Sequence, residues 1–234
     1  MPTYTTHVLP LADAAAQQQA IALLAQAEIF AAPTDTVYGI FARPDLPAAI
    51  ERIYIAKNRP PHKAIPILIG DQSDLPLVAQ PLWSPLWSPL WSPLAEALMA
   101  RFWPGALTLV LPAQPHLPAI LTAGQPTIAV RMPAHDALRA LLRRTGPLAA
   151  TSANRSSGPD THCADEVQAQ LDGYLPLILR DDAATGVQSD APAHRSLPST
   201  LVDLTHAAGP RILRAGELVD EVRALLDAWS RDEC

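Results

Sequence analysis

The chain has 234 residues, 49% of them hydrophobic and 17% charged, and a formal net charge of −6 at pH 7. This length suits one large domain or two small ones with a sizeable core. The acidic balance, with no block of like charge, excludes nucleic-acid binding by bulk electrostatic attraction, so any RNA contact would need a local basic patch.

The two cysteines, Cys163 and Cys234, have no metal-ligand spacing, which favours free thiols in a reducing compartment. Residues 1–10 lack the basic and apolar regions of a signal peptide, and no run approaches the ~20 apolar residues of a membrane span. These observations predict a cytoplasmic protein with no membrane contact.

Helical and strand-like hydrophobic patterns alternate along the first half of the chain. Asp13 is a suitable cap for the first helix, and Pro60 and Pro61 stop the second helix after Lys57. The predicted elements are a helix at 13–27, a strand at 29–32, a helix at 45–57, a strand at 65–69, a helix at 94–102 and a strand at 107–111.

Residues 81–94 are a tandem repeat of Pro-Leu-Trp-Ser, three times, followed by Pro-Leu. A four-residue period with proline in every unit cannot form a regular helix and is far shorter than the unit of a solenoid fold. One unit suffices to lead into the next helix, so we interpret the extra copies as an expansion in a surface loop. Stacking of the tryptophans on bases is the alternative, and a role covering an apolar patch is favoured over it.

The second half continues the alternation without keeping it strictly. The predicted elements are a strand at 127–131, a helix at 135–146, a strand at 148–151, a helix at 164–171, strands at 175–179, 199–204 and 211–214, and a helix at 217–229. This order favours a single α/β domain around a mixed sheet over a purely doubly wound fold.

Small polar residues gather near the ends of these strands. The segment 33–39, Pro-Thr-Asp-Thr-Val-Tyr-Gly, suits a loop that meets a small polar ligand, and a solvated strand-to-helix turn is the plainer alternative. Open α/β sheets bind ligands in a crevice at strand ends. We therefore expect one site to be surrounded by four polar pairs: Thr34/Thr36, Lys57/Arg59, Ser152/Asn154 and Ser199/Thr200.

Lys57 and Arg59 are the candidate anion-binding pair. Because Arg59 precedes Pro60, it is biased to an extended conformation, in which residues i and i+2 point the same way and both cations converge on a phosphate or carboxylate. The alternative is a solvated helix C-terminus, where cations are favoured without a ligand. By the same spacing, Ser152 and Asn154 share a face if their segment is extended, and are otherwise ordinary turn residues.

Arg131 ends an otherwise apolar strand. Alternation places Thr127, Ala129 and Arg131 on one face of that strand and Ile128 and Val130 on the other. An arginine in such a strand usually has a paired anion, so a polar partner or ligand is expected beside Arg131.

Several common kinds of catalytic site are absent from the sequence. There is no Gly-rich loop ending in Gly-Lys-Ser/Thr, no Gly-x-Gly-x-x-Gly, no histidine cluster with zinc spacing and no nucleophile elbow. The histidines are scattered and are expected at the surface. The candidate residues describe a site for a polyanion and a small polar molecule, which acts by positioning and electrostatics.

Seven short motifs occur in chain order: Pro33–Gly39, Lys57-x-Arg59-Pro60, Phe102–Gly105, Thr127–Pro133, Ser152-Ala-Asn154, Ser199–Leu204 and Ile212–Gly216. Together they resemble the YrdC-like family, the threonylcarbamoyl-AMP synthases of tRNA modification. The resemblance implies one YrdC-like domain over 10–220, with a twisted mixed parallel and antiparallel sheet flanked by helices and a central concave cleft. Residues 221–234 would then be a C-terminal helix that packs on the same domain or trails from it.

The resemblance also implies a reaction in which L-threonine, bicarbonate and ATP, accompanied by Mg²⁺, give threonylcarbamoyl-AMP and pyrophosphate. Downstream partner proteins would pass the threonylcarbamoyl group to tRNA, which the chain itself could contact. By similarity, Lys57 and Arg59 would be catalytic, with bicarbonate near Lys57. The threonine site would be lined by Thr36, Arg131, Ser152 and Ser199, and ATP would be held by Lys57, Arg59, Lys63, Thr127, Asn154 and Arg214.

Two departures from the family pattern keep other functions open. Leu68 stands near the position where some relatives have a histidine that contacts threonine, and the segment after Asn154 differs from the usual one, which leaves an ATP contact at Thr161 or His162 open. The alternatives are an RNA-binding module with a basic concavity and a paralogue that binds nucleotide without making the threonine product.

Overall fold

The structure, a computed structural model, describes residues 3–81, 92–181 and 197–232. Within these residues ten strands form one sheet. They are β1 (His7–Pro10), β2 (Phe30–Ala32), β3 (Gly39–Ala42), β4 (Ile67–Leu68), β5 (Leu107–Pro112), β6 (Thr127–Arg131), β7 (Leu148–Ser152), β8 (Leu177–Arg180), β9 (Thr200–Asp203) and β10 (Arg211–Arg214).

The helices pack on both faces of this sheet. They are α1 (Ala14–Ala25), α2 (Pro47–Lys57), the 3₁₀-helix η1 (Gln72–Leu77), α3 (Pro93–Phe102), α4 (Ala119–Thr122), α5 (Asp136–Thr145), α6 (Ala164–Leu171) and α7 (Val219–Asp232). None of the helices in the described residues is long and apolar enough to cross a membrane.

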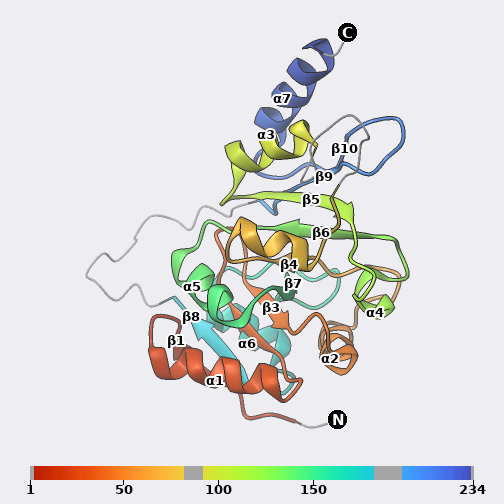
Figure 1. Cartoon of the computed structure of the whole chain (residues 1–234). Coiled ribbons are helices and arrows are strands. Elements are labelled where there is room, and N and C mark those ends of the chain that lie inside the picture. Colours follow the sequence, from red (N-terminus) through yellow and green to blue (C-terminus); the bar gives the residue numbers. More distant parts are fainter. Residues whose placement is uncertain (1–2, 82–91, 182–196, 233–234) are drawn as a thin grey trace, which may run out of the picture.

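The strand order is β1-β8-β2-β3-β7-β4-β6-β5-β9-β10 (Figure 1). The pairs β1–β8, β8–β2, β4–β6 and β5–β9 are parallel, and the remaining neighbours are antiparallel. The predicted single α/β fold with a mixed sheet is therefore confirmed.

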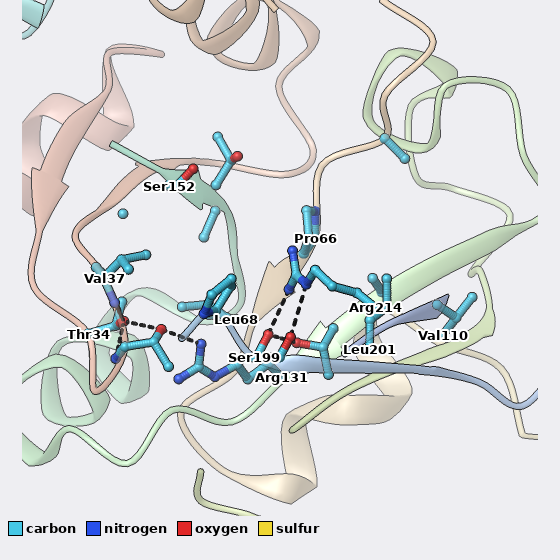
Figure 2. Close-up of a pocket in the computed structure, with 18 of the residues that line it drawn as sticks. Thr34, Val37, Pro66, Leu68, Val110, Arg131, Ser152, Ser199, Leu201 and Arg214 are labelled. Carbon is cyan, nitrogen blue, oxygen red and sulfur yellow. Dashed lines mark hydrogen bonds between the residues drawn. The ribbon is translucent and has the colours of Figure 1, made fainter. Parts of the chain in front are cut away.

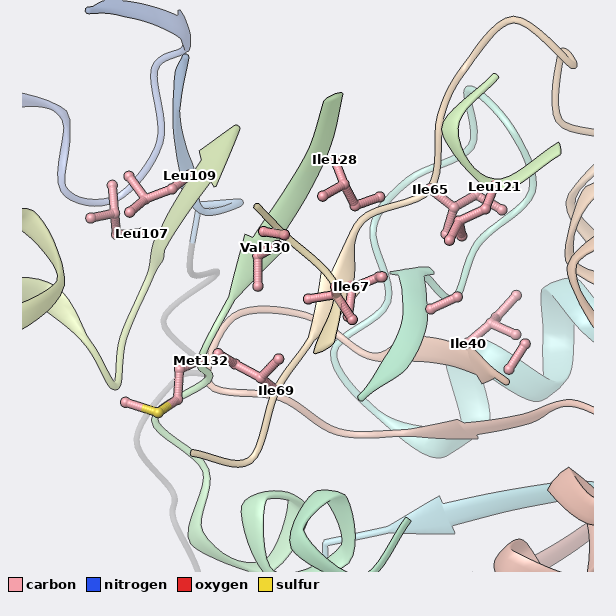
Figure 3. Packing of buried hydrophobic residues seen from close by; sticks show 14 of the residues in the cluster. Ile40, Ile65, Ile67, Ile69, Leu107, Leu109, Leu121, Ile128, Val130 and Met132 are labelled. Atoms are coloured by element: carbon pink, nitrogen blue, oxygen red, sulfur yellow. The ribbon is translucent and has the colours of Figure 1, made fainter. Parts of the chain in front are cut away.

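Alternate strand residues pack into two hydrophobic clusters, one on each face of the sheet. On β2, Phe30 and Ala32 belong to the cluster under α1 and α5, whereas Ala31 belongs to the larger cluster that α2, α3, α4, α6 and α7 cover. Figure 3 shows part of the larger cluster, where Ile67, Val130 and Leu109 of three neighbouring strands lie.

The cluster under α1 and α5 extends over only part of its face. Its strand residues come from β2, β3, β4, β7 and β8, and none comes from β5, β6, β9 or β10 among the described residues. In the part of the chain that the structure describes, the second half of the sheet is therefore packed on one face only. Its opposite face, which carries the alternate residues of β5, β6 and β9, is left for a binding site.

Most predicted elements are present, several with small shifts in their ends. The predicted strand at 127–131 and helix at 164–171 have the bounds of β6 and α6, and Asp13 caps α1 through its side chain, which accepts from the Ala15 amide. The predicted strand at 65–69 is wrong in length, because only Ile67–Leu68 forms β4. Strands β1 and β3 were not predicted; β3 is buried on both sides and so lacks alternation.

The 81–94 repeat lies mostly outside the described residues. Its last unit supplies the start of α3, where the Ser92 side chain accepts from the Ala95 amide and Pro93 is the first helical residue. At the other end of the chain, Val222 and Leu226 of α7 are buried in the larger cluster. Helix α7 thus packs on the domain next to α3 (Figure 1).

Candidate active site

A pocket of about 480 Å³ lies on the open face of the sheet. Strands β4, β5, β6, β7 and β9 form its floor, and the loop after β2 and the end of β10 form its sides (Figure 2). Thr127, Ala129 and Arg131 of β6 all line it, while Ile128 and Val130 are buried on the far side. The alternation predicted for this strand is therefore confirmed.

The position of the pocket corrects one expectation. The site was predicted in a crevice at strand ends, but β6 lines the pocket from its first residue, Thr127, to its last, Arg131. The pocket lies across a face of the sheet because the helices of that face cover only the other half. Polar residues within strands, such as Thr108 on β5, therefore belong to it.

The 33–39 segment forms the connection between the antiparallel strands β2 and β3. Thr34 organises it: the Thr34 hydroxyl accepts from the amides of Thr36 (3.1 Å) and Val37 (3.2 Å) and donates to the Val37 carbonyl (2.7 Å). Thr36 and Tyr38 are buried. The alternative of a solvated strand-to-helix turn is wrong, because the segment joins two strands and two of its side chains are enclosed.

Arg131 is nearly enclosed at this loop, with 7% of its side chain exposed. Its Nη2 forms an ion pair with Asp35 (2.5 Å), Nη1 donates to the Thr36 hydroxyl (2.8 Å) and Nε donates to the Gly105 carbonyl (2.9 Å). The expected anionic partner of Arg131 is thus Asp35. These three bonds use three of the five guanidinium N–H groups, so the arginine keeps donors for a ligand.

A second polar group joins β5, β9 and β10. The Ser199 and Thr108 hydroxyls lie 2.7 Å apart, and Arg214 donates from Nη2 to the Ser199 hydroxyl and from Nε to the Ser199 carbonyl, both at 3.0 Å (Figure 2). Burial, and after it the positive charge of Arg131, lowers the pKa of Arg214. Because two guanidinium groups repel each other here, an anion in the pocket would be favoured.

The predicted convergence of Lys57 and Arg59 is wrong. Lys57 is the last residue of α2, and Asn58 takes a left-handed conformation (φ 51°, ψ 47°), so the segment is not extended. The two side chains have different partners: Arg59 lines the pocket and donates to the carbonyls of Lys63 (3.0 Å) and Ala64 (2.7 Å). The proline that follows Arg59 does not override the helix C-cap.

Lys57 lies behind the pocket wall with 2% of its surface exposed. Its ammonium donates to the Ser152 carbonyl, to the Asn154 carbonyl (2.6 Å) and to Asn154 Oδ1 (2.9 Å). The Ser152 hydroxyl donates to the same Oδ1 (2.7 Å), so Ser152 and Asn154 do lie on one side as predicted. Only Ser152 of this trio lines the pocket.

The buried ammonium gives a pH-dependent stability that can be measured. Burial, helped by the charge of Arg59 and opposed by that of Asp160, lowers the pKa of Lys57 from 10.5 to about 7. Between these values the unfolded chain binds more protons at Lys57 than the folded chain. The free energy of unfolding should therefore rise as the pH increases above 7, and Lys57 should contribute at most about 1.4 kcal/mol per pH unit to this rise. The gain is lost as the pH falls back to 7.

Urea unfolding of the wild type and of Lys57→Met between about pH 6.5 and 9 tests this. The rise should be present in the wild type and absent from Lys57→Met, and Lys63→Met, at an exposed lysine, should keep it. Parallel pH profiles for the wild type and Lys57→Met would show that Lys57 does not change its charge in this range.

The structure brings most of the predicted site residues together. Those that line the pocket are Thr36, Arg59, Thr127, Arg131, Ser152, Ser199 and Arg214. Lys57 and Asn154 bond to each other behind the pocket wall. The Lys63 carbonyl accepts from Arg59, and Lys63 is exposed to solvent. Neither Thr161, which is buried and donates to the Ala153 carbonyl, nor His162 lines the pocket.

Sequence reasoning missed Asp35, Thr108 and Asp160. Thr108 had a signal, because it is the single hydroxyl in the apolar run 107–111. Asp160 lines the pocket from an irregular loop and had none. One histidine also differs from the expected surface position: His135 caps α5 through Nδ1, and its side chain is 14% exposed.

Fold and site together define an α/β domain with a mixed sheet. Part of one sheet face is not covered by helices in the described residues, and it carries a polar, arginine-rich pocket. The sequence model of the Sua5/YciO/YrdC family, described as "Telomere recombination", matches residues 22–216. The chain therefore belongs to this family, as its motifs indicated.

Named relatives share much of the sequence. A threonylcarbamoyl-AMP synthase of Bacillus subtilis is 42% identical over 171 residues, which cover 72% of this chain and 46% of that protein. One of Pyrococcus abyssi is 34% identical over 209 residues, covering 88% and 56%. The chain thus spans about half the length of these relatives.

A solved structure supports the fold. The crystal structure of P. abyssi Sua5 complexed with L-threonine superposes with a TM-score of 0.77 at 31% identity and covers 94% of this chain and 61% of that one.

Proposed function

We propose that the chain joins L-threonine, bicarbonate and ATP into threonylcarbamoyl-AMP, with release of pyrophosphate. The observation that carries the proposal is the pocket itself, which holds three guanidinium groups, from Arg59, Arg131 and Arg214, beside several hydroxyl groups on one sheet face. The names of the relatives, and the threonine in the P. abyssi complex, support this reading.

Arg59 and Arg214 are proposed to hold the triphosphate. Arg214 uses two of its five N–H groups on Ser199, so three remain for phosphate oxygens. Guanidinium groups suit this task because they bind phosphate with two parallel hydrogen bonds. Thr127, at the start of β6, is proposed to contact ATP from the floor of the pocket.

The amino acid is proposed to bind beside the 33–39 loop. Arg131 would take the threonine carboxylate with its remaining N–H donors, since Asp35, Thr36 and Gly105 occupy the others. The Ser152 hydroxyl, which donates to Asn154, keeps lone pairs to accept from the substrate. Leu68 adds an apolar surface to this end of the pocket.

The proposed chemistry has two bond-forming steps. The threonine amine attacks the carbon of bicarbonate, and loss of water gives a carbamate. A carbamate oxygen then attacks the α-phosphorus of ATP, the bond from that phosphorus to the bridging oxygen breaks, and pyrophosphate leaves. Such a reaction needs ordered reactants and stabilised negative charge, which the arginines provide.

A positioning role is proposed for Lys57 in place of the catalytic role that the resemblance implies. It lies behind the wall, so we propose that it positions the substrate-facing hydroxyl of Ser152 through the Ser152 and Asn154 carbonyls and the Asn154 amide oxygen. Bicarbonate would then meet Ser152 and Arg59 rather than the ammonium itself.

A magnesium ion is proposed to accompany ATP. No group of three or more His, Cys, Asp and Glu in the described residues could hold a metal, so this part of the chain offers no metal cage of its own. An ion that is bound mainly by phosphates and water, with one carboxylate, fits the residues present. When bound, it would neutralise charge on the phosphates.

Pyrophosphate release with single omissions tests the proposal. Release should require ATP, threonine and bicarbonate together, and mass spectrometry should detect threonylcarbamoyl-AMP. Release that does not depend on threonine would favour a nucleotide-binding paralogue with another substrate. No release, combined with salt-dependent RNA binding, would favour an RNA-binding module.

The product would be the substrate of the proteins that transfer the threonylcarbamoyl group to tRNA. A cytoplasmic location is proposed for the chain together with this function. These partners are supported by the resemblance alone. Mixing the chain with ATP, threonine, bicarbonate, tRNA and a transferase of this pathway should modify the tRNA only when the chain is present.

A further inference from the structure

Asp160 is the only carboxylate among the described residues that line the pocket. It lies in the loop between β7 and α6, and its side chain is exposed. No hydrogen bond or ion pair within the described part of the chain involves its carboxylate, in contrast to Asp35, which pairs with Arg131. A free carboxylate in an arginine-rich pocket needs an explanation.

The backbone on both sides of Asp160 is fixed. The carbonyl of Pro159 accepts from Gln170 Nε2 (3.0 Å), and Thr161 is fully buried, with its carbonyl accepting from the Tyr38 amide (2.8 Å). The Thr161 hydroxyl donates to the Ala153 carbonyl (3.2 Å). The carboxylate is therefore held at the pocket wall by its neighbours while making no bond of its own.

The charge of Asp160 acts on the cationic groups around the phosphate end of the pocket. It partly offsets the lowering of the pKa of both Lys57 and Arg214, although it bonds to neither. Bound alone, a triphosphate would be repelled by this carboxylate. A divalent cation between the phosphates and the carboxylate reverses the sign of that interaction.

We propose that Asp160 binds the Mg²⁺ of Mg·ATP and so makes the site selective for the metal-bound nucleotide. This inference rests on the proposed function, because it assumes that ATP occupies the pocket. The competing role for Asp160 is acceptance of a hydrogen bond from a ribose hydroxyl, which would not depend on metal. The two roles predict different responses to removal of Mg²⁺.

The test is the affinity for α,β-methylene-ATP, measured by calorimetry with Mg²⁺ and with EDTA. In the wild type, Mg²⁺ should strengthen binding. In Asp160→Asn the factor by which Mg²⁺ strengthens binding should be smaller by about tenfold or more. Loss of a residue that merely hydrogen-bonds to a metal ligand already weakens metal binding by this amount. With EDTA, the variant should bind as tightly as the wild type or more tightly, because a repulsive charge is gone.

Two other variants complete the experiment. Asp160→Ser should behave as Asp160→Asn, because both remove the charge at an exposed position. Asp172→Asn, at an exposed aspartate after α6, makes the same change in net charge and should keep the wild-type response to Mg²⁺. Unfolding midpoints of all variants should match the wild type.

The outcomes separate this inference from the proposed function. Equal weakening of Asp160→Asn with Mg²⁺ and with EDTA would overturn the metal role in favour of a hydroxyl contact. No change under either condition would also overturn it. Failure of the wild type to bind the analogue at all would overturn the proposed function, and this inference with it.

Discussion

Replacing Arg131 with alanine is expected to lower the free energy of unfolding by about 3 kcal/mol, because it leaves the partly enclosed Asp35 carboxylate without its partner. Thr36 and the Gly105 carbonyl lose a donor at the same time. Threonine-dependent pyrophosphate release should fall by about 100-fold or more, since charge-assisted hydrogen bonds to the substrate are lost. Urea unfolding and the release assay measure the two effects.

A double variant separates stability from function. Asp35→Asn with Arg131→Met removes both charges, so much of the lost stability should return. The activity should not return, because no guanidinium remains for the threonine carboxylate. An Arg131→Ala protein that keeps both its unfolding midpoint and its dependence on threonine would contradict the role given to this arginine.

Replacing Gly216 with alanine is expected to disable the site from outside the pocket. A Cβ on this glycine would lie 2.2 Å from the Pro198 carbonyl oxygen and 2.4 Å from the Ser199 carbonyl carbon, both in the backbone. The backbone that carries Ser199 must therefore move, and with it the two acceptors of Arg214. We expect a stability loss of about 1–3 kcal/mol, typical of overpacking, and a large loss of ATP binding.

Gly209→Ala is the matched control. Gly209 lies between β9 and β10 with φ +101°, and a Cβ there would meet no atom within 4 Å. This change should cost stability through backbone strain yet leave ATP affinity unchanged. Wild-type ATP affinity in Gly216→Ala would show that the close packing of this glycine does not position Ser199.

Predictions that depend on local patterns agreed best with the structure. The alternation in 127–131 identified the strand, the buried face and the pocket-facing Arg131, because each strand residue must point to one side or the other. The Asp13 cap of α1 and the mixed order of helices and strands were likewise readable from residue types.

Predictions that depended on tertiary context did less well. The Lys57-Arg59 pair looked extended because of Pro60, but the helix end at Asn58 determines where both side chains go. The uncovered sheet face depends on which strands α1 and α5 reach, and no short pattern records that. Asp160 is placed at the pocket by contacts of its neighbours with other segments, so its position could not be predicted from the sequence.

The proposed function requires that one pocket bind ATP and threonine together. Calorimetric titration of L-threonine into the protein saturated with Mg²⁺ and α,β-methylene-ATP tests it most directly. One threonine should bind per chain while the nucleotide analogue stays bound. Displacement of the analogue by threonine, or the absence of any threonine binding to the loaded protein, would contradict it.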